Sequence, residues 1–472
     1  IAGDEQSSKE VLKNLGQPDL SKGFVKQAVD EIYQIANVFF NERNKEMARR
    51  IYNLVAPFES RLSHVSGGNL GKKIQWDPPL EPDIEDLKNR IEDTFGKKES
   101  VIVEKPAMAR YTEQVGTKEI ESLRGQKLLL AMREHCWGFE SRIWEPVRNC
   151  KVTAESLGLE VRLFNIDAVV FGGERCGEQR TRILSEMSDE IESFHPDFVV
   201  VDNLGMDVYE SPLYSEFSPL FVETLRKLKE RFNFRLIGMY PDAWDPKCVE
   251  AINYVTPWTD CLWYLNYSVF LQLPESGQAK SVVLPFPSIE TSSGSVWDHE
   301  RTIEAGFLGT SKRYNALRSL WFLAMEDAGI CFELLLTDPI KAPGRLQLTD
   351  EEYSEMLGKM KTCIHFSGRN LAANILCGRV WEALLAGCTL VEEENIDTKA
   401  LLVPYLHYIP FGSIRDLAVA VGCMQKYPLV QEKLAREGHL WASTTLNSAK
   451  IWARVLIGES VREAKTGSVA NS

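Results

Sequence analysis

Two stretches in the second half of the chain combine glycine with charged side chains in a pattern suited to a phosphorylated ligand. In the first, a short apolar run ends at Gly309 and is followed by Lys312 and Arg313. Glycine lets the backbone approach a ligand closely, the start of a following helix offers unpaired N–H groups, and two cations favour an anion. The pattern predicts phosphate binding, although any strand, turn and helix can carry a glycine and an arginine.

The second stretch, residues 379–391, predicts a helix followed by a strand. Arg379, Glu382 and Ala386 are three or four residues apart and therefore share one helical face, and Gly387 follows where the helix would end. At the carboxyl ends of parallel strands, such a carboxylate could accept hydrogen bonds from a ribose diol. The alternative is a surface ion pair between Arg379 and Glu382.

Two series of short apolar runs, which suit buried strands, surround these stretches. Amphipathic segments of ten or more residues separate the runs, and a long helix is expected from about residue 440 to 457. This alternation predicts βαβ units and parallel sheets. The predicted strands are residues 126–132, 159–166, 198–201 and 235–239, and then 305–308, 331–336, 362–366, 389–391 and 408–410.

Residues 1 to about 120 are polar and helical in pattern. Their apolar residues recur at helical spacing in two stripes. Such helices either pack on the rest of the protein or form a module that binds a protein partner or an acceptor. The stripes are Val25, Ala28, Ile32, Ile35, Ala36 and Phe39, and then Ala48, Ile51, Tyr52, Val55 and Phe58.

We therefore predict an α/β fold with two Rossmann-like domains that face a cleft and an N-terminal helical extension. At 472 residues the chain is too long for a single core. A Pro-, Ser- and Gly-containing stretch between the two series suits a linker. The expected divisions are residues 1–122, 123–290 and 291–460, with both charged stretches in the last domain.

Composition excludes several classes of protein. The net charge is −13 with no basic stripe, which argues against nucleic-acid binding. No apolar run approaches the roughly 18 residues of a membrane span. The ten cysteines include no CxxC pair, so we expect neither a disulfide framework nor a structural zinc site, but reduced cysteines in a cytoplasmic protein.

An ordered set of motifs in residues 300 to 450 resembles the C-terminal domain of CgeB-like glycosyltransferases, which have the GT-B fold. Residues 125–290 resemble the partner domain only loosely. The resemblance implies transfer of a sugar from a UDP-, GDP- or other nucleoside diphosphate sugar to an acceptor hydroxyl. The motifs are Gly306-Phe307-Leu308-Gly309, Arg313, Glu352-Tyr353, Phe366-Ser367, Arg379-Val380-Trp381-Glu382 and Leu385-Ala386-Gly387.

The same resemblance assigns roles to individual residues. Lys312 and Arg313 match the pyrophosphate contacts, and Glu382 matches the glutamate that holds the ribose. Arg379 would reach the phosphates or brace Glu382. An earlier glutamate of related retaining enzymes falls on Asn374 here. Because an amide cannot stabilise positive charge as a carboxylate does, the donor-hexose contacts and the stereochemical outcome stay open.

Other candidates lie at predicted strand ends. Asp242, after the strand 235–239, would be the catalytic base if the reaction inverts, with Asp245 as competitor and a plain turn as the alternative. His365 would donate to a phosphate or sugar hydroxyl, or be a core histidine. Glu134 and His135 follow the first strand and would touch the acceptor.

Two further acidic segments are weaker candidates. Asp202-Asn203 occupies a strand end equivalent to that of Glu134, and Glu392-Glu393-Glu394 is interpreted as a solvated loop rather than a metal site. No Asp-x-Asp triplet follows a predicted strand, so no obligatory metal is expected. Helix N–H groups and cations would then stabilise the leaving diphosphate.

Two other functions fit the same architecture. One is a sugar-nucleotide epimerase, in which His365 and Asp242 would act as acid and base on the hexose. The other is an inactive GT-B-like interaction protein that binds a partner through its N-terminal helices.

Overall fold

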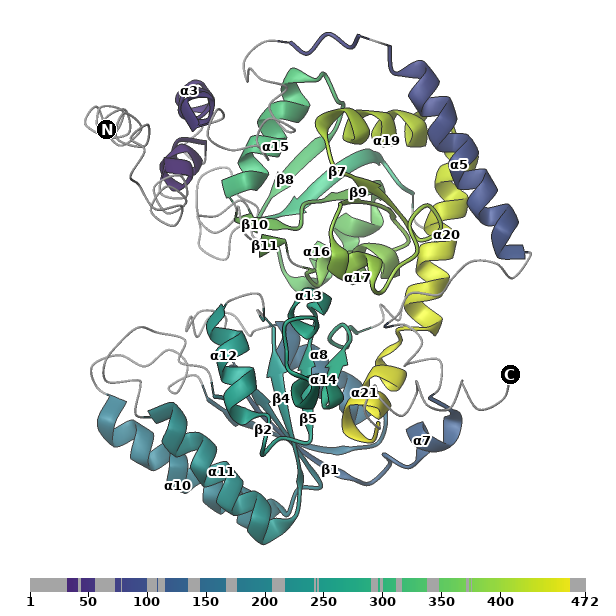
Figure 1. The fold of residues 1–472 in the computed structure, drawn as a ribbon. Coiled ribbons are helices and arrows are strands. Elements are labelled where there is room, and N and C mark those ends of the chain that lie inside the picture. Colours follow the sequence, from purple (N-terminus) through teal and green to yellow (C-terminus); the bar gives the residue numbers. More distant parts are fainter. Residues whose placement is uncertain are drawn as a thin grey trace. The chain divides into compact units, whose positions relative to one another are not determined.

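The chain divides into two compact units (Figure 1). The first comprises the described residues within Ile1–Glu104, Ser292–Asn395 and Val403–Leu440, and the second those within Lys105–Thr291, Ile396–Leu402 and Trp441–Ser472. The structure is a computed structural model, and it describes residues 32–40, 44–55, 73–77, 79–99, 108, 115–134, 145–166, 176–205, 217–241, 243, 246–289, 296–297, 300–310, 316–337, 348–370, 373–374 and 376–458.

The second unit is built on a parallel six-stranded sheet with the order β2-β1-β3-β4-β5-β6. Its central strands, β1 (Lys127–Met132), β3 (Phe198–Asp202) and β4 (Arg235–Tyr240), are almost entirely buried apolar runs. Such runs are typical of strands covered on both faces. The remaining strands are β2 (Glu160–Asn165), β5 (Cys261–Tyr264) and β6 (Ser281–Val283).

Helices cover both faces of this sheet. The C-terminal helix α21 (Ser448–Leu456) and α8 (Glu145–Ser156) share one apolar core with the strands, and Trp452 of α21 lies 5.5 Å from Trp263 of β5 between ring centroids. Helices α10 (Cys176–Phe194) and α11 (Phe217–Phe232) pack against each other. The other helices are α7 (Thr117–Glu121), α12 (Pro246–Val255), α13 (Tyr267–Phe270), α14 (Glu275–Ala279) and α18 (Ile396–Lys399).

The first unit contains a parallel five-stranded sheet with the order β13-β12-β9-β7-β8. Strand β12 continues two residues beyond its predicted end, and a short antiparallel pair, β10 (Gly368–Asn370) and β11 (Ala373–Asn374), follows β9. The five strands of the parallel sheet are β7 (Ile303–Gly309), β8 (Glu333–Leu336), β9 (Met360–His365), β12 (Thr389–Glu393) and β13 (Tyr408–Phe411).

Helices also flank this sheet on both faces (Figure 1). α15 (Ala316–Asp327) and α19 (Ile414–Lys426) pack together on one face, and α16 (Asp350–Gly358) and α17 (Arg379–Leu385) pack together on the other. The expected single C-terminal helix is instead two, because α20 (Pro428–Thr444) ends before Asn447, whose side chain accepts a hydrogen bond at the start of α21.

The described N-terminal helices pack on the first unit. Residues 32–40 and α3 (Lys45–Val55) bury their apolar stripes in the same core as α15, and Arg49 pairs with Asp327 at 2.8 Å. Helix α5 (Glu81–Glu99) packs on α19, where Arg415 Nε donates to Asp83 at 2.8 Å. Of the two interpretations drawn from the sequence, packing on the rest of the protein therefore holds for these helices.

The fold class predicted from the sequence is confirmed in its main parts. Each unit is a Rossmann-like α/β structure with a parallel sheet, and the described N-terminal part is helical. The units differ from the predicted divisions because the N-terminal helices belong to the first unit and α21 to the second. None of the described helices combines the length and apolar character needed to cross a membrane.

Candidate functional site

The strand order of the first unit reverses between β7 and β9. The chain passes from β7 to β8 on one side, whereas β9, β12 and β13 lie on the other. Open α/β sheets bind ligands beyond the carboxyl ends of the strands at such a point. Arg318 of α15 holds the two strand ends together, since Nη1 donates to the Thr310 carbonyl at 3.0 Å and Nη2 donates to the Phe366 carbonyl at 3.2 Å.

Gly309 ends β7 in direct contact with the guanidinium group of Arg379. Its φ of 152° is one that residues with a side chain rarely adopt. A Cβ atom at this position would lie 2.4 Å from Nη2 of Arg379. The backbone conformation therefore favours glycine, and a side chain at this position would displace the guanidinium group.

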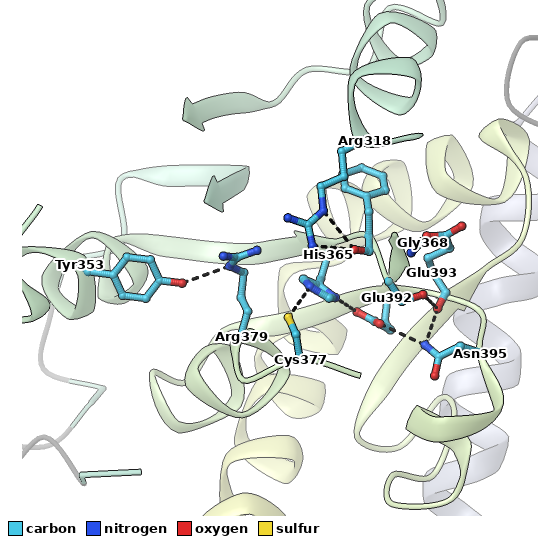
Figure 2. A network of polar contacts seen from close by, with 11 residues as sticks. Arg318, Tyr353, His365, Gly368, Cys377, Arg379, Glu392, Glu393 and Asn395 are labelled. Atoms are coloured by element: carbon cyan, nitrogen blue, oxygen red, sulfur yellow. Dashed lines mark hydrogen bonds and ion pairs between the residues drawn. The ribbon is translucent and has the colours of Figure 1, made fainter. Parts of the chain in front are cut away.

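Arg379 and Glu382 are joined through a tyrosine rather than by a direct ion pair. Arg379 Nε donates to Tyr353 Oη at 3.1 Å (Figure 2), and the same hydroxyl donates to Glu382 Oε2 at 2.8 Å. Burial raises the pKa of the Tyr353 phenol well above its ordinary value, so it remains a donor. The surface ion pair considered from the sequence is therefore not what these side chains form.

The guanidinium group of Arg379 forms no direct ion pair among the described residues, since Tyr353 lies between it and Glu382. Its Nη1 is shielded from solvent and has no hydrogen-bond partner, and no described carboxylate forms an ion pair with it. The group also lies over the ring of Phe307, 5.3 Å from the centroid. Because a shielded charge without a direct ion pair is costly, this arrangement favours the binding of an anion.

A second polar network lies at the ends of β9 and β12. His365 Nδ1 is 2.5 Å from Glu392 Oε2, and His365 Nε2 is 3.0 Å from Cys377 Sγ (Figure 2). His365 and Glu392 are both fully buried. Burial lowers the pKa of His365 and raises that of Glu392 to about 7. Of the two roles considered from the sequence, this favours a core histidine, and its partners are the side chains of Glu392 and Cys377.

The interpretation of residues 392–394 as a solvated loop is wrong for the first two. Glu392 and Glu393 end strand β12 and are buried. Glu393 Oε2 accepts a hydrogen bond from the Gly368 N–H at 2.7 Å, and Asn395 donates to Glu392 Oε1 at 3.2 Å. Across the described part of the chain, no three His, Cys, Asp or Glu side chains are placed to hold a metal ion.

Several predicted site residues lie outside the described part of the chain. These are His135, Asp242, its competitor Asp245, Lys312 and Arg313. Asn374 is described only in its backbone, which pairs with Gly368 in the short β10–β11 hairpin. Their roles remain predictions.

In the second unit, the candidates at the strand ends are engaged with neighbouring side chains. Glu134 Oε2 accepts a hydrogen bond from Asn165 Nδ2 at 2.9 Å. Asp202, whose side chain is fully buried, pairs with Arg133. Both lie at the carboxyl ends of strands β1 and β3, where the order of this sheet also reverses.

The sequence did not assign a role to Tyr353, Cys377 or Arg318. Tyr353 was part of the recognised motif set, which was the one available signal. Cys377 and Arg318 gave none, because His365 is 12 residues from Cys377, and Phe366, one of two partners of Arg318, is 48 residues from it.

Neither protein-family models nor curated proteins match this sequence. The structure is similar to Alr3699/HepE from Anabaena in complex with UDP and glucose, with a TM-score of 0.45, 10% identity, and coverage of 73% of this chain and 100% of that one. It is also similar to sucrose-phosphate synthase from Thermosynechococcus elongatus (TM-score 0.48, 12% identity, 74% and 100% covered) and to a glycosyltransferase from Rickettsia africae (0.43, 8%, 74% and 100%). At these identities the similarity concerns the fold.

Proposed function

We propose that the chain is a CgeB-like GT-B glycosyltransferase that moves a sugar from a nucleoside diphosphate sugar to an acceptor hydroxyl. The observation that carries the proposal is the position of Arg379. Its shielded guanidinium contacts Gly309 at the point where the strand order reverses, and among the described residues it forms no direct ion pair and leaves Nη1 without a hydrogen-bond partner. A diphosphate oxygen would supply a negative charge and accept from Nη1.

The ribose of the nucleotide would bind at Glu382. One oxygen of this carboxylate accepts from Tyr353, and the side chain as a whole is partly exposed. A carboxylate oxygen can accept more than one hydrogen bond, so a ribose diol can donate to it. Tyr353 thus connects the group proposed for the phosphate with the group proposed for the ribose.

The remaining roles belong to the same proposal. Lys312 and Arg313 would bind the pyrophosphate with Arg379, and Asn374 would face the donor hexose. The other residues would lie on the acceptor side, with Asp242 as the base of an inverting reaction and Glu134 and His135 touching the acceptor. We propose that no obligatory metal takes part, so turnover should persist in excess EDTA.

Calorimetry with UDP, GDP, CDP and ADP tests the proposal directly. We expect one of them to bind, and Arg379→Met to weaken that binding roughly 10- to 150-fold, because a hydrogen bond to a charged group contributes about 1.5–3 kcal/mol. Arg415→Met is the matched control, since it removes a guanidinium that pairs with Asp83 elsewhere in the unit. Equal affinities of the two variants would refute the assignment.

A second measurement separates transfer from isomerisation of the donor. The nucleotide sugar that binds is incubated without an acceptor, and the products are separated by chromatography. A glycosyltransferase leaves the hexose unchanged or hydrolyses it slowly. Conversion to an epimeric sugar nucleotide would show an epimerase, and failure to bind any nucleotide would favour an inactive interaction protein.

A further inference from the structure

We propose that Cys377 is a nucleophilic thiol and a site of modification by small hydroperoxides, with His365 as its base and Glu392 as the group that positions the base. The inference does not depend on the proposed glycosyl transfer. It rests on a hydrogen-bonded chain of side chains that the proposed reaction does not use (Figure 2).

The geometry places the three groups in the order that activates a thiol. Cys377 Sγ lies 3.0 Å from His365 Nε2, and His365 Nδ1 lies 2.5 Å from Glu392 Oε2. A carboxylate that accepts the Nδ1 proton leaves Nε2 with its lone pair toward the sulfur. A nucleophile within reach of a base that a third group orients is the general signature of an activated nucleophile.

The surroundings hold this chain in place. Asn395 donates to the second carboxylate oxygen of Glu392 at 3.2 Å, and both His365 and Glu392 are fully buried. Burial, together with the neighbouring cations Arg379 and Arg318, lowers the pKa of His365, and Glu392 acts in the opposite direction. A neutral imidazole can take the thiol proton at neutral pH.

Access distinguishes Cys377 from the other described cysteines. Six of the eight are buried, Cys331 is exposed, and Cys377 is partly exposed. A partly exposed thiol admits a small oxidant more readily than a bulky one, which favours a hydroperoxide. Cys331 contacts none of the three residues of the chain and is therefore an internal control.

The reaction balances with the hydroperoxide as the oxidant. His365 takes the thiol proton as the sulfur attacks the terminal oxygen of the peroxide. An S–O bond forms and the O–O bond breaks, and the alkoxide leaving group takes the proton from His365. The products are a cysteine sulfenic acid and an alcohol, or water when the oxidant is hydrogen peroxide. The sulfur loses two electrons and the peroxide gains them.

The test treats the intact protein with hydrogen peroxide, traps sulfenic acid with dimedone and quantifies each cysteine peptide by mass spectrometry. We expect Cys377 to react at least about tenfold faster than Cys331, since general-base assistance outweighs its lower exposure. In urea the two rates should converge. A Cys377 rate no higher than that of Cys331 in the folded protein, or an advantage that persists in urea, would overturn the proposal.

Variants then test the base and the group that positions it. Glu392→Gln should lower the Cys377 rate about tenfold or more and leave the Cys331 rate unchanged. His365→Gln should do the same. Because either variant could disturb folding, Asn395→Ala provides a milder one, with a partial decrease expected. Unchanged Cys377 rates in folded Glu392→Gln protein would overturn the assignment, and thermal unfolding identifies the folded variants.

Discussion

Gly309→Ala is the substitution that most directly tests the contact between the strand end and the arginine. The added Cβ would lie 2.4 Å from Nη2, 2.5 Å from Cζ and 2.7 Å from Nη1 of Arg379, whereas ordinary contact begins at 3.4 Å. The guanidinium would therefore have to move by about 1 Å. Such a shift strains the 3.1 Å hydrogen bond to Tyr353, which is already at the long end of the normal range.

Two different costs follow from this substitution, and they are measured separately. A side chain at φ 152° destabilises the fold by about 1–3 kcal/mol. Displacement of the guanidinium removes a charged hydrogen bond to the nucleotide, which corresponds to about 1.5–3 kcal/mol and thus to a roughly 10- to 150-fold loss of affinity. Thermal unfolding reports the first cost and calorimetry with the nucleotide reports the second.

Gly329→Ala provides the matched control. Gly329 also has a positive φ, 68°, but an added Cβ there would meet nothing within 4 Å. This variant should lose stability and keep its nucleotide affinity. In an Arg379→Ala background, Gly309→Ala should cause little further loss of affinity. If Gly309→Ala binds nucleotide as tightly as the unaltered chain, the reasoning fails.

Three further predictions concern the hydrogen-bonded groups and the core. Tyr353→Phe removes the hydroxyl between Arg379 and Glu382, so nucleotide affinity in calorimetry should fall by about 1 kcal/mol, or roughly fivefold. An unchanged affinity would show that the tyrosine does not couple the two groups. Burial raises the pKa of Glu392 from 4.5 to about 7, so the folded state binds the extra proton and this contribution to stability is lost as the pH rises through that window. Between pH 5 and 8, the free energy of unfolding measured in urea should therefore fall by roughly 2 kcal/mol in the unaltered chain and in the exposed control Glu394→Gln. Glu392→Gln should not show this decrease. Trp452→Ala empties a fully buried position and should cost about 3–5 kcal/mol, while Trp452→Phe should cost less.

Regular elements were predictable where one local signal dominated. The apolar runs of β1, β3 and β4 are strands because both of their faces are covered, and nothing distant is needed to infer this. β5 was missed because its four residues, Cys261–Tyr264, are too short a run to stand out. The break between α20 and α21 was missed although Asn447 is a favourable N-cap.

The site was predictable only as far as neighbours in sequence determine it. Arg379 and Glu382 fall on one turn of a helix, so their proximity follows from spacing. The tyrosine that joins them comes from α16, 26 residues from Arg379. The prediction for Glu392 followed the general rule that acidic runs are solvated. The rule failed because His365 and Asn395 supply hydrogen-bond partners from outside the strand.

The assignment of α21 to the second unit bears on how the protein is synthesised. Residues 441–458 follow the whole first unit in the chain, yet Trp452 and its neighbours fill the core beneath β1, β4 and β5. On the ribosome, this sheet must therefore wait with an open apolar face until residues 441–458 have been made. A premature stop codon ahead of α21 would remove part of this core, although the strands of the sheet are made before those of the first unit.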